Sequence, residues 1–224
     1  MVGDETLRCI AADEALLVLD KPSGLLCVPG RGEDKQDCLS ARAQAQWPQA
    51  LVVHRLDMST SGLVLMALSP LVQRQLSLAF EQRAVHKRYV AMVHGILTAD
   101  AADAADAADE WQTIDAPIAA DWPRRPLRIV DAAGKPSQTR WRVLAHNPPG
   151  WPGCTRVELE PITGRTHQLR VHLAHLGYPI LGDALYASPA IAAAAPRLLL
   201  HAQQLGLAHP QSGEWREFHL PAPF

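Results

Sequence analysis

The segment 54–63, His-Arg-Leu-Asp-Met-Ser-Thr-Ser-Gly-Leu, limits what the chain can fold into because it places polar turn residues between two apolar runs. The runs 51–53 and 63–68 are short and predict buried strands on either side of a loop. Asp57 then lies in a loop held by rigid supports, where functional groups often occur. An aspartate there either caps its own turn or is a positioned reactive group, and the local pattern leaves both open.

The remaining pattern alternates several strands with a few helices. A capping Ser69 followed by Pro70 opens one helix, whose stripe of Val72, Leu76, Ala79 and Phe80 suits a buried face. A second helix is predicted to be capped by Asp37 or Ser40. A third helix has Thr163 or Thr166 near its start and Gly177 after its end. Those two helices are predicted at 37–47 and 166–176, and strands at 14–20, 51–53, 63–68, 87–94, 113–118, 135–144, 156–160 and 203–208.

This order of elements predicts an α+β fold around a largely antiparallel or mixed sheet. No linker or repeat divides the chain, so residues 1–224 are expected to form a single domain. The run 99–110, built on Ala-Ala-Asp triplets, is the one low-complexity stretch. Period three lays no continuous stripe on a helix, so a solvated loop is expected there.

Composition is that of an ordinary globular protein, with 48% hydrophobic and 20% charged residues. No apolar run is long enough to cross a bilayer, and the first twenty residues lack a basic start and a long apolar core. The four cysteines are scattered and form no Cys-x-x-Cys pair, as in a reducing compartment. A cytoplasmic protein without a membrane partner is therefore expected.

The formal charge of −2 is unevenly distributed. Residues 99–110 hold five acids and no base, so without them the remaining chain has a charge of +3. Residues 121–170 hold nine Lys and Arg against four acids, a local excess of +5. A basic surface that meets phosphates is compatible with this distribution, and so is a solvated face without a partner.

The sequence of the loop, His-Arg-Leu-Asp-x-x-Thr-Ser-Gly, resembles the signature of the RluA family of pseudouridine synthases. Further segments follow in the order of that family from about residue 14 to the end of the chain. They are 21–25 (Lys-Pro-Ser-Gly-Leu), 87–91 (Lys-Arg-Tyr-Val-Ala), 121–123 (Asp-Trp-Pro), 134–136 (Gly-Lys-Pro), 164–172 (Gly-Arg-Thr-His-Gln-Leu-Arg-Val-His), 181–183 (Leu-Gly-Asp) and 196–202 (Pro-Arg-Leu-Leu-Leu-His-Ala). The Asp-Trp-Pro-x-Arg-Pro stretch and the short N-terminus resemble the RluA type within the family, which implies a single catalytic domain over residues 1–224 without a separate N-terminal RNA-binding domain.

The resemblance implies a long bent sheet in two halves with an active-site cleft, and an isomerase that needs no cofactor. Uracil is detached from its ribose, turned over and rejoined through carbon. Asp57 matches the catalytic carboxylate, as nucleophile or as base, and Arg170 the basic residue that pairs with it. Tyr89 matches the aromatic residue on which the extruded base stacks, although a tyrosine in a strand pattern also suits an ordinary core. Leu169 is expected to pack near the base.

Arg55 is a candidate to fill or brace the gap that the extruded base leaves, or to grip its phosphate. His54, Arg165, Thr166 and His167 are assigned to RNA contact or to loop architecture. The RluA type acts on transfer RNA and on large-subunit ribosomal RNA, which implies a uridine in an anticodon stem-loop and another in a 23S hairpin. A monomer without an obligate protein partner is expected.

Other classes of function find less support in the residues. His172 and His175 could share a helix face, but no third ligand is suggested by spacing and no metal is expected. Neither a dinucleotide fingerprint nor a phosphate-binding loop occurs. A noncatalytic RNA-binding protein that kept the scaffold is disfavoured because Asp57, Tyr89 and Arg170 are all present. A hydrolase built on Asp57 and a histidine lacks a nucleophile elbow.

Overall fold

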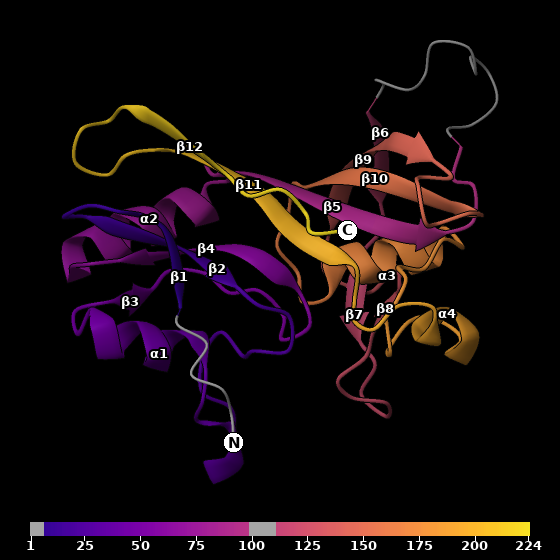
Figure 1. Cartoon of the computed structure of the whole chain (residues 1–224), viewed down its shortest axis with the longest axis horizontal. Helices are drawn as coiled ribbons and strands as arrows, with labels where there is room; N and C mark the ends of the chain where they lie inside the picture. The colour runs from indigo at the N-terminus through magenta and orange to yellow at the C-terminus, as the bar shows by residue number, and fades with distance from the viewer. Residues whose placement is uncertain (1–6, 99–110) are drawn as a thin grey trace. The chain divides into compact units, whose positions relative to one another are not determined.

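The computed structural model describes residues 7–98 and 111–224, so the loop predicted at 99–110 lies outside the described residues. The chain divides into two compact units. Unit 1 comprises Met1–Lys87 and Ala202–Pro223, and unit 2 comprises Arg88–His201 with Phe224. That they act as one catalytic domain stays a prediction. The many strands and few helices, drawn in Figure 1, confirm the α+β class.

The strands of unit 1 follow the order β1-β2-β4-β11, with β3 on β4 and β12 on β11. β2 is antiparallel to both β1 and β4, so the predicted strands 14–20 and 63–68 are neighbours. Their side chains form one hydrophobic core with those of α2. The elements are β1 (Arg8–Ala12), β2 (Leu16–Lys21), the 3-10 helix η1 (Glu33–Lys35), α1 (Leu39–Gln46), β3 (Leu51–Val52), β4 (Ser61–Ala67), α2 (Pro70–Glu81), β11 (Leu200–Ala208) and β12 (Trp215–His219).

Helix α2 begins as its sequence predicts. The Ser69 side chain accepts a hydrogen bond from the Val72 N–H at 3.3 Å, with Pro70 in the first turn, and Val72 and Leu76 are buried. The cap predicted for α1 is wrong, because Cys38 precedes the helix and gives no side-chain cap. The Asp37 carboxylate instead binds the Arg42 guanidinium at 2.7 and 2.8 Å.

Unit 2 is built on four antiparallel strands in the order β5-β10-β9-β6, together with a separate β7–β8 hairpin. Its core joins side chains of β5, β9 and β10 to Leu169 and Leu173 of α3. The elements are β5 (His86–His94), β6 (Gln112–Asp115), β7 (Ile118–Ala120), β8 (Arg128–Val130), β9 (Gln138–His146), β10 (Cys154–Pro161), α3 (Gln168–His175) and α4 (Pro189–Ala193).

Several predicted boundaries differ from the structure. The strand predicted at 113–118 is two strands, β6 and β7, because the chain turns at Ala116-Pro117 and proline donates no ladder hydrogen bond. Helix α3 begins at Gln168, two residues later than predicted, after His167 in a left-handed conformation. Neither threonine caps it: the Thr163 hydroxyl donates to the Gln168 side chain at 2.7 Å. β12 was missed because its side chains are mostly exposed.

Gly62 permits the close approach of β4 to β11 and gives a test of the fold. Its φ is +113°, and an added Cβ would clash with the Ala202 carbonyl oxygen and lie 2.6 Å from the Ala202 nitrogen. We expect Gly62→Ala to lower the free energy of unfolding by about 2–3 kcal/mol, through backbone strain and overpacking together.

Urea unfolding of the Gly62 variant and of Gly213→Ala measures this effect. Gly213 also has a positive φ, +74°, but a Cβ there meets nothing within 4 Å, so only the strain applies. Equal losses in the two variants would show that the contact with β11 is not tight.

Candidate active site

Asp57 lies in the loop between β3 and β4 and is half-buried. A main-chain hydrogen bond from the Thr60 N–H to the Asp57 carbonyl oxygen, 3.1 Å long, closes the turn. Thr60 and Ser61 are buried, whereas Arg55 and Met58 are exposed. The loop therefore fixes the backbone of Asp57 and turns the side chains of Arg55 and Met58 outward.

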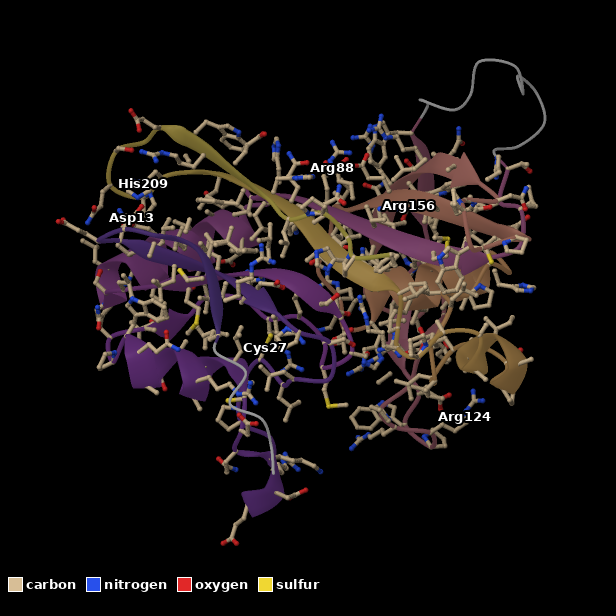
Figure 2. The ribbon with its side chains drawn as sticks, viewed as in Figure 1. Asp13, Cys27, Arg88, Arg124, Arg156 and His209 are labelled. Atoms are coloured by element: carbon tan, nitrogen blue, oxygen red, sulfur yellow. The ribbon has the colours of Figure 1, made fainter. Side chains whose placement is uncertain are left out.

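The segment after β2 holds this loop in place. The Gly24 N–H donates to the Met58 carbonyl at 2.8 Å, and the Ser23 hydroxyl donates to the Ser59 carbonyl at 2.7 Å. The Leu56 N–H donates to the Cys27 sulfur at 3.2 Å, and Figure 2 labels Cys27 at this position. Burial raises the pKa of the Cys27 thiol, which keeps it a neutral acceptor. Contacts thus flank Asp57 on both sides.

Lys21 is the centre of this support. Its side chain is fully buried, and its ammonium donates to the carbonyl oxygens of Pro22, Leu25 and Met58 at 2.8, 2.7 and 2.9 Å. Three acceptors match the three N–H donors of an ammonium. Burial lowers the pKa of Lys21 to about 8, against the opposing influence of Cys27, Asp57 and Asp20. Lys21 therefore places a positive charge close to Asp57. Its ammonium and the Asp57 loop stabilise each other through the hydrogen bond to Met58.

His54 belongs to the architecture of the loop. Its ring stacks on Phe80 with centroids 4.4 Å apart, and its Nε2 accepts the Leu65 N–H at 2.9 Å. Burial, with a smaller contribution from the charge of Lys87, lowers the pKa of His54 to about 3. The ring is therefore neutral and its proton is on Nδ1. Of the two roles open to His54, this geometry supports loop architecture.

In unit 2, Arg170 projects from α3 into a buried ion pair with Asp183. Nε and Nη2 donate to the two carboxylate oxygens at 2.8 and 2.6 Å, and the side chains are 4% and 1% exposed. The Asp183 carboxylate also accepts the N–H groups of Leu185 and Tyr186 at 2.9 and 3.2 Å. The Arg170 guanidinium carbon lies 5.1 Å from the Tyr186 ring centre. The arginine is thus oriented by a planar fork and an aromatic face.

The start of α3 is ordered by a buried amide. The Gln168 side chain accepts from the Thr163 hydroxyl and the Arg165 N–H, and donates to the Gln138 carbonyl and the Thr139 hydroxyl, at 2.7 to 3.0 Å. Arg165 and Thr166 remain exposed on this ordered turn.

His167 follows on the same turn. Its Nδ1 lies 2.6 Å from the Tyr186 hydroxyl oxygen. Tyr186 thus connects the first turn of α3 to the ion pair of Arg170 and Asp183. Its N–H donates to Asp183, and its ring lies beside Arg170.

Tyr89 lies on β5 opposite Leu159 of β10, and its half-buried ring packs on the core cluster that contains Leu169. Leu169 itself is 7% exposed. The structure therefore groups Tyr89, Leu169, His167 and Arg170 within unit 2, and Asp57, Arg55 and His54 within unit 1. The pairing of Asp57 with Arg170 stays a prediction.

Of the two histidines of α3, His172 is engaged in packing, whereas His175 is exposed. His172 is fully buried, with Nδ1 2.9 Å from the Thr139 hydroxyl and Nε2 2.9 Å from the Ala116 carbonyl oxygen. Burial lowers the pKa of His172, so a neutral ring is favoured, with its proton on the nitrogen that faces the carbonyl. Within residues 7–98 and 111–224, no three His, Cys, Asp or Glu side chains are grouped to bind a metal. No helix in those ranges is long and apolar enough to span a membrane.

Comparison with known proteins identifies the family of the chain. Residues 15–175 match the sequence model of the RNA pseudouridylate synthase family. The dual-specificity RNA pseudouridine synthase RluA of Escherichia coli (strain K12) is 45% identical over 213 residues, which cover 95% of this chain and 91% of that protein. The enzyme of the same name from Pasteurella multocida is 42% identical over 222 residues, with coverage of 99% and 95%.

Solved structures show the same fold. Human RNA pseudouridylate synthase domain containing 1 superposes with a TM-score of 0.79 at 29% identity, covering 98% of this chain and 85% of that one. Human RNA pseudouridylate synthase domain containing 4 gives 0.70 at 24% identity, with coverage of 96% and 88%. The chain therefore belongs to the RNA pseudouridylate synthase family of isomerases, which confirms the resemblance of its motifs.

The sequence predictions do not include Lys21, Asp183 and Tyr186. The first two lie in the segments Lys-Pro-Ser-Gly and Leu-Gly-Asp, which match the family but have no predicted role. The position of Lys21, at the end of an apolar strand and before Pro-Ser-Gly, could have indicated its role. A charge at the end of a buried strand needs hydrogen-bond acceptors.

The state of Lys21 gives a prediction for pH. Below about pH 8 the lysine is protonated in both the folded and the unfolded chain; between about 8 and 10.5, the folded chain has released a proton that the unfolded chain still binds. The free energy of unfolding of the wild type should therefore rise relative to that of Lys21→Met, by about 2 kcal/mol between about pH 7 and pH 9.5. Urea unfolding of both proteins at the two pH values measures it. A constant difference would mean that the three carbonyls keep the ammonium charged to higher pH.

Proposed function

We propose that this chain converts uridine to pseudouridine in the anticodon stem-loop of transfer RNA and in a hairpin of 23S ribosomal RNA, and that Asp57 is the catalytic carboxylate. The observation that carries the proposal is the Asp57 loop, fixed from 56 to 59 by Lys21, Ser23, Gly24 and Cys27. Such fixing suits a group that must meet a reacting atom in one geometry. The dual specificity follows that of the relatives.

In the proposed reaction the bond between uracil N1 and the ribose breaks and a bond from the ribose to uracil C5 replaces it. The hydrogen of C5 leaves as a proton and N1 gains one, so the product is an isomer of the substrate. Asp57 acts on the sugar as nucleophile or as base; both roles require the ionised form. Lys21 places a positive charge near Asp57 within unit 1.

We further propose that Arg170 pairs with Asp57 in the assembled site. Its fork to Asp183 through Nε and Nη2 would hold the guanidinium in one orientation for this pairing. Tyr89 would give the flat face on which extruded uracil stacks, with Leu169 beside it. Arg55 would fill the place of the extruded base, and the exposed Arg165 and Thr166, with His167, would contact the RNA.

The rest of the proposal concerns the setting of the enzyme. The reaction needs no cofactor, and shared loop shape rather than a long base sequence would allow two kinds of RNA substrate. We propose a monomer that works in the cytoplasm without an obligate protein partner.

Asp57→Asn tests the carboxylate directly. The amide keeps the size of the side chain but not its charge, so turnover should fall by at least about a thousandfold while RNA affinity stays nearly unchanged. Pseudouridine is mapped in bulk transfer RNA and in a 23S hairpin after incubation with each variant. Asp34→Asn, the same change at an exposed position of η1, is the matched control. Activity of Asp57→Asn within about tenfold of the wild type would remove Asp57 from the mechanism.

Arg170→Ala and Asp183→Asn separate the two roles of the arginine. Arg170→Ala leaves the Asp183 carboxylate buried without its cation and should destabilise unit 2 by about 3–5 kcal/mol. It should also abolish most single-turnover activity, because Asp57 loses its partner. Arg170→Lys should recover only part of both, since an ammonium makes no fork.

Asp183→Asn disturbs the fork but leaves the arginine in place, so its activity should fall less than that of Arg170→Ala. Stability is followed by urea unfolding and activity by a single-turnover assay with excess enzyme. A full single-turnover rate for folded Arg170→Ala would exclude the pairing with Asp57.

A further inference from the structure

The loop between β7 and β8 exposes a tryptophan that the fold of unit 2 does not use. Figure 1 shows this loop projecting beyond the two strands of the hairpin, and Trp122 in it is 69% exposed. The guanidinium carbon of Arg125 lies 3.6 Å from the centre of the Trp122 ring. An aromatic side chain so exposed forgoes the stabilisation that burial would give it.

The loop is held in one shape by its own contacts. The Asp121 carboxylate, which is buried, accepts from Arg124 Nε and Nη2 at 2.7 and 2.6 Å and from the Arg124 N–H at 3.3 Å. Main-chain hydrogen bonds join Asp121 to Leu127 and Leu127 to Arg124 at 3.1 and 3.0 Å. Figure 2 labels Arg124 in this loop. The aromatic ring is therefore displayed on an ordered turn.

The two arginines of the turn differ in their use. Asp121 neutralises Arg124, whereas across the described parts of the chain no carboxylate pairs with Arg125, whose guanidinium lies over the Trp122 ring. With one face of the indole covered by a guanidinium, the exposed remainder offers a flat surface beside a positive charge. That combination matches a nucleobase and its phosphate.

A second exposed tryptophan, Trp215, differs because its indole makes polar contacts within the protein. Trp215, 48% exposed, donates its indole N–H to Glu217 at 3.0 Å and meets the His86 ring edge to face at 4.8 Å. Its neighbours are thus an acid and a histidine, and its polar atom is satisfied within unit 1. It is a suitable control for the effect of deleting an exposed indole.

The hairpin is also tied to the arginine of the candidate site. The Arg128 N–H at the start of β8 donates to the Tyr186 hydroxyl at 3.0 Å, and the Tyr186 ring lies against Arg170. The display of Trp122 is therefore fixed relative to Arg170 within unit 2. A nucleotide held at the hairpin would be held at a set distance from that residue.

We propose that Trp122 and Arg125 form a docking platform for an unpaired nucleotide of the RNA loop, with the base stacked on Trp122 and its phosphate near Arg125. The inference rests on the proposed function only in taking RNA as the ligand. Splayed loop bases present the flat face that such a platform needs, whereas bases inside an A-form duplex do not.

The test measures RNA affinity without turnover, in the Asp57→Asn background, on a synthetic anticodon stem-loop and on a fully paired duplex of the same length. Trp122→Ala should weaken hairpin binding by about tenfold, within the range of one lost base stack. Trp122→Phe should retain most of the affinity because it keeps a flat ring. Trp215→Ala should bind as the parent does. Duplex binding should not change with any of the three.

Arg125→Ala should weaken hairpin binding and lower the salt dependence by about one phosphate contact. Hairpin affinity of Trp122→Ala within about twofold of the parent would overturn the platform, and so would equal losses on hairpin and duplex. The proposed function is tested by a different measurement. It would fail if the enzyme with Asp57 intact formed no pseudouridine, and the RNA affinities would still test the platform. Photocrosslinking of a 5-bromouridine hairpin gives a second readout, which should place the crosslink at Trp122; a hairpin that crosslinks only elsewhere would count against the proposal.

Discussion

A charged side chain can stay inside a protein only where acceptors or an opposite charge replace the water it has lost, and the candidate residues of each unit are organised around this constraint. In unit 1 the fully buried Lys21 gathers three carbonyl oxygens from two segments distant in sequence, one of them next to Asp57. In unit 2 the buried Arg170 and Asp183 gather two main-chain N–H groups and the Tyr186 ring. Each cation therefore fixes backbone as well as charge, which is what a site with one required geometry needs. The same buried groups make the site sensitive to substitution, because removing one partner leaves the other unsatisfied.

Much of the fold follows from local pattern. The strands on either side of Asp57, the helix that opens at Ser69-Pro70 and the strand that carries Tyr89 all depend on apolar runs bounded by turn residues, and the structure contains each of them. Elements whose stability comes from elsewhere were missed or displaced. β12 pairs through its backbone with β11 and exposes most of its side chains, so it has no hydrophobic period to detect. The start of α3 depends on the Gln168 amide and its four partners, two of them on β9, far from the helix in sequence.

The site divides in a similar way. Asp57, Tyr89 and Arg170 could be named from the resemblance of short segments, since such segments preserve order along the chain. The partners of these residues could not, because they depend on tertiary contacts: Asp183 is thirteen positions from Arg170, and Met58 is thirty-seven from Lys21. His54 is a residue whose role the sequence left open. A polar residue in a signature suggests contact with a ligand, but its nitrogen accepts a main-chain N–H and its ring stacks on Phe80. A motif thus records what a fold requires as well as what a reaction requires.

The excess of positive charge counted along residues 121–170 overstates the charge that is available to RNA phosphates. Three of the four acids in 121–170 are engaged with arginines: Asp121 with Arg124, Glu158 with Arg142 and Glu160 with Arg140. Arg88, Arg140 and Arg142 also gather around the Trp111 ring at 4.2 to 5.0 Å, where they serve the surface of the sheet. The positive charge left for phosphates is then concentrated on a few exposed side chains, among them Arg125 and Arg165, each on an ordered turn. A near-neutral protein can bind RNA on this basis if a few charges are placed beside surfaces that accept bases, so that position supplies what total charge does not.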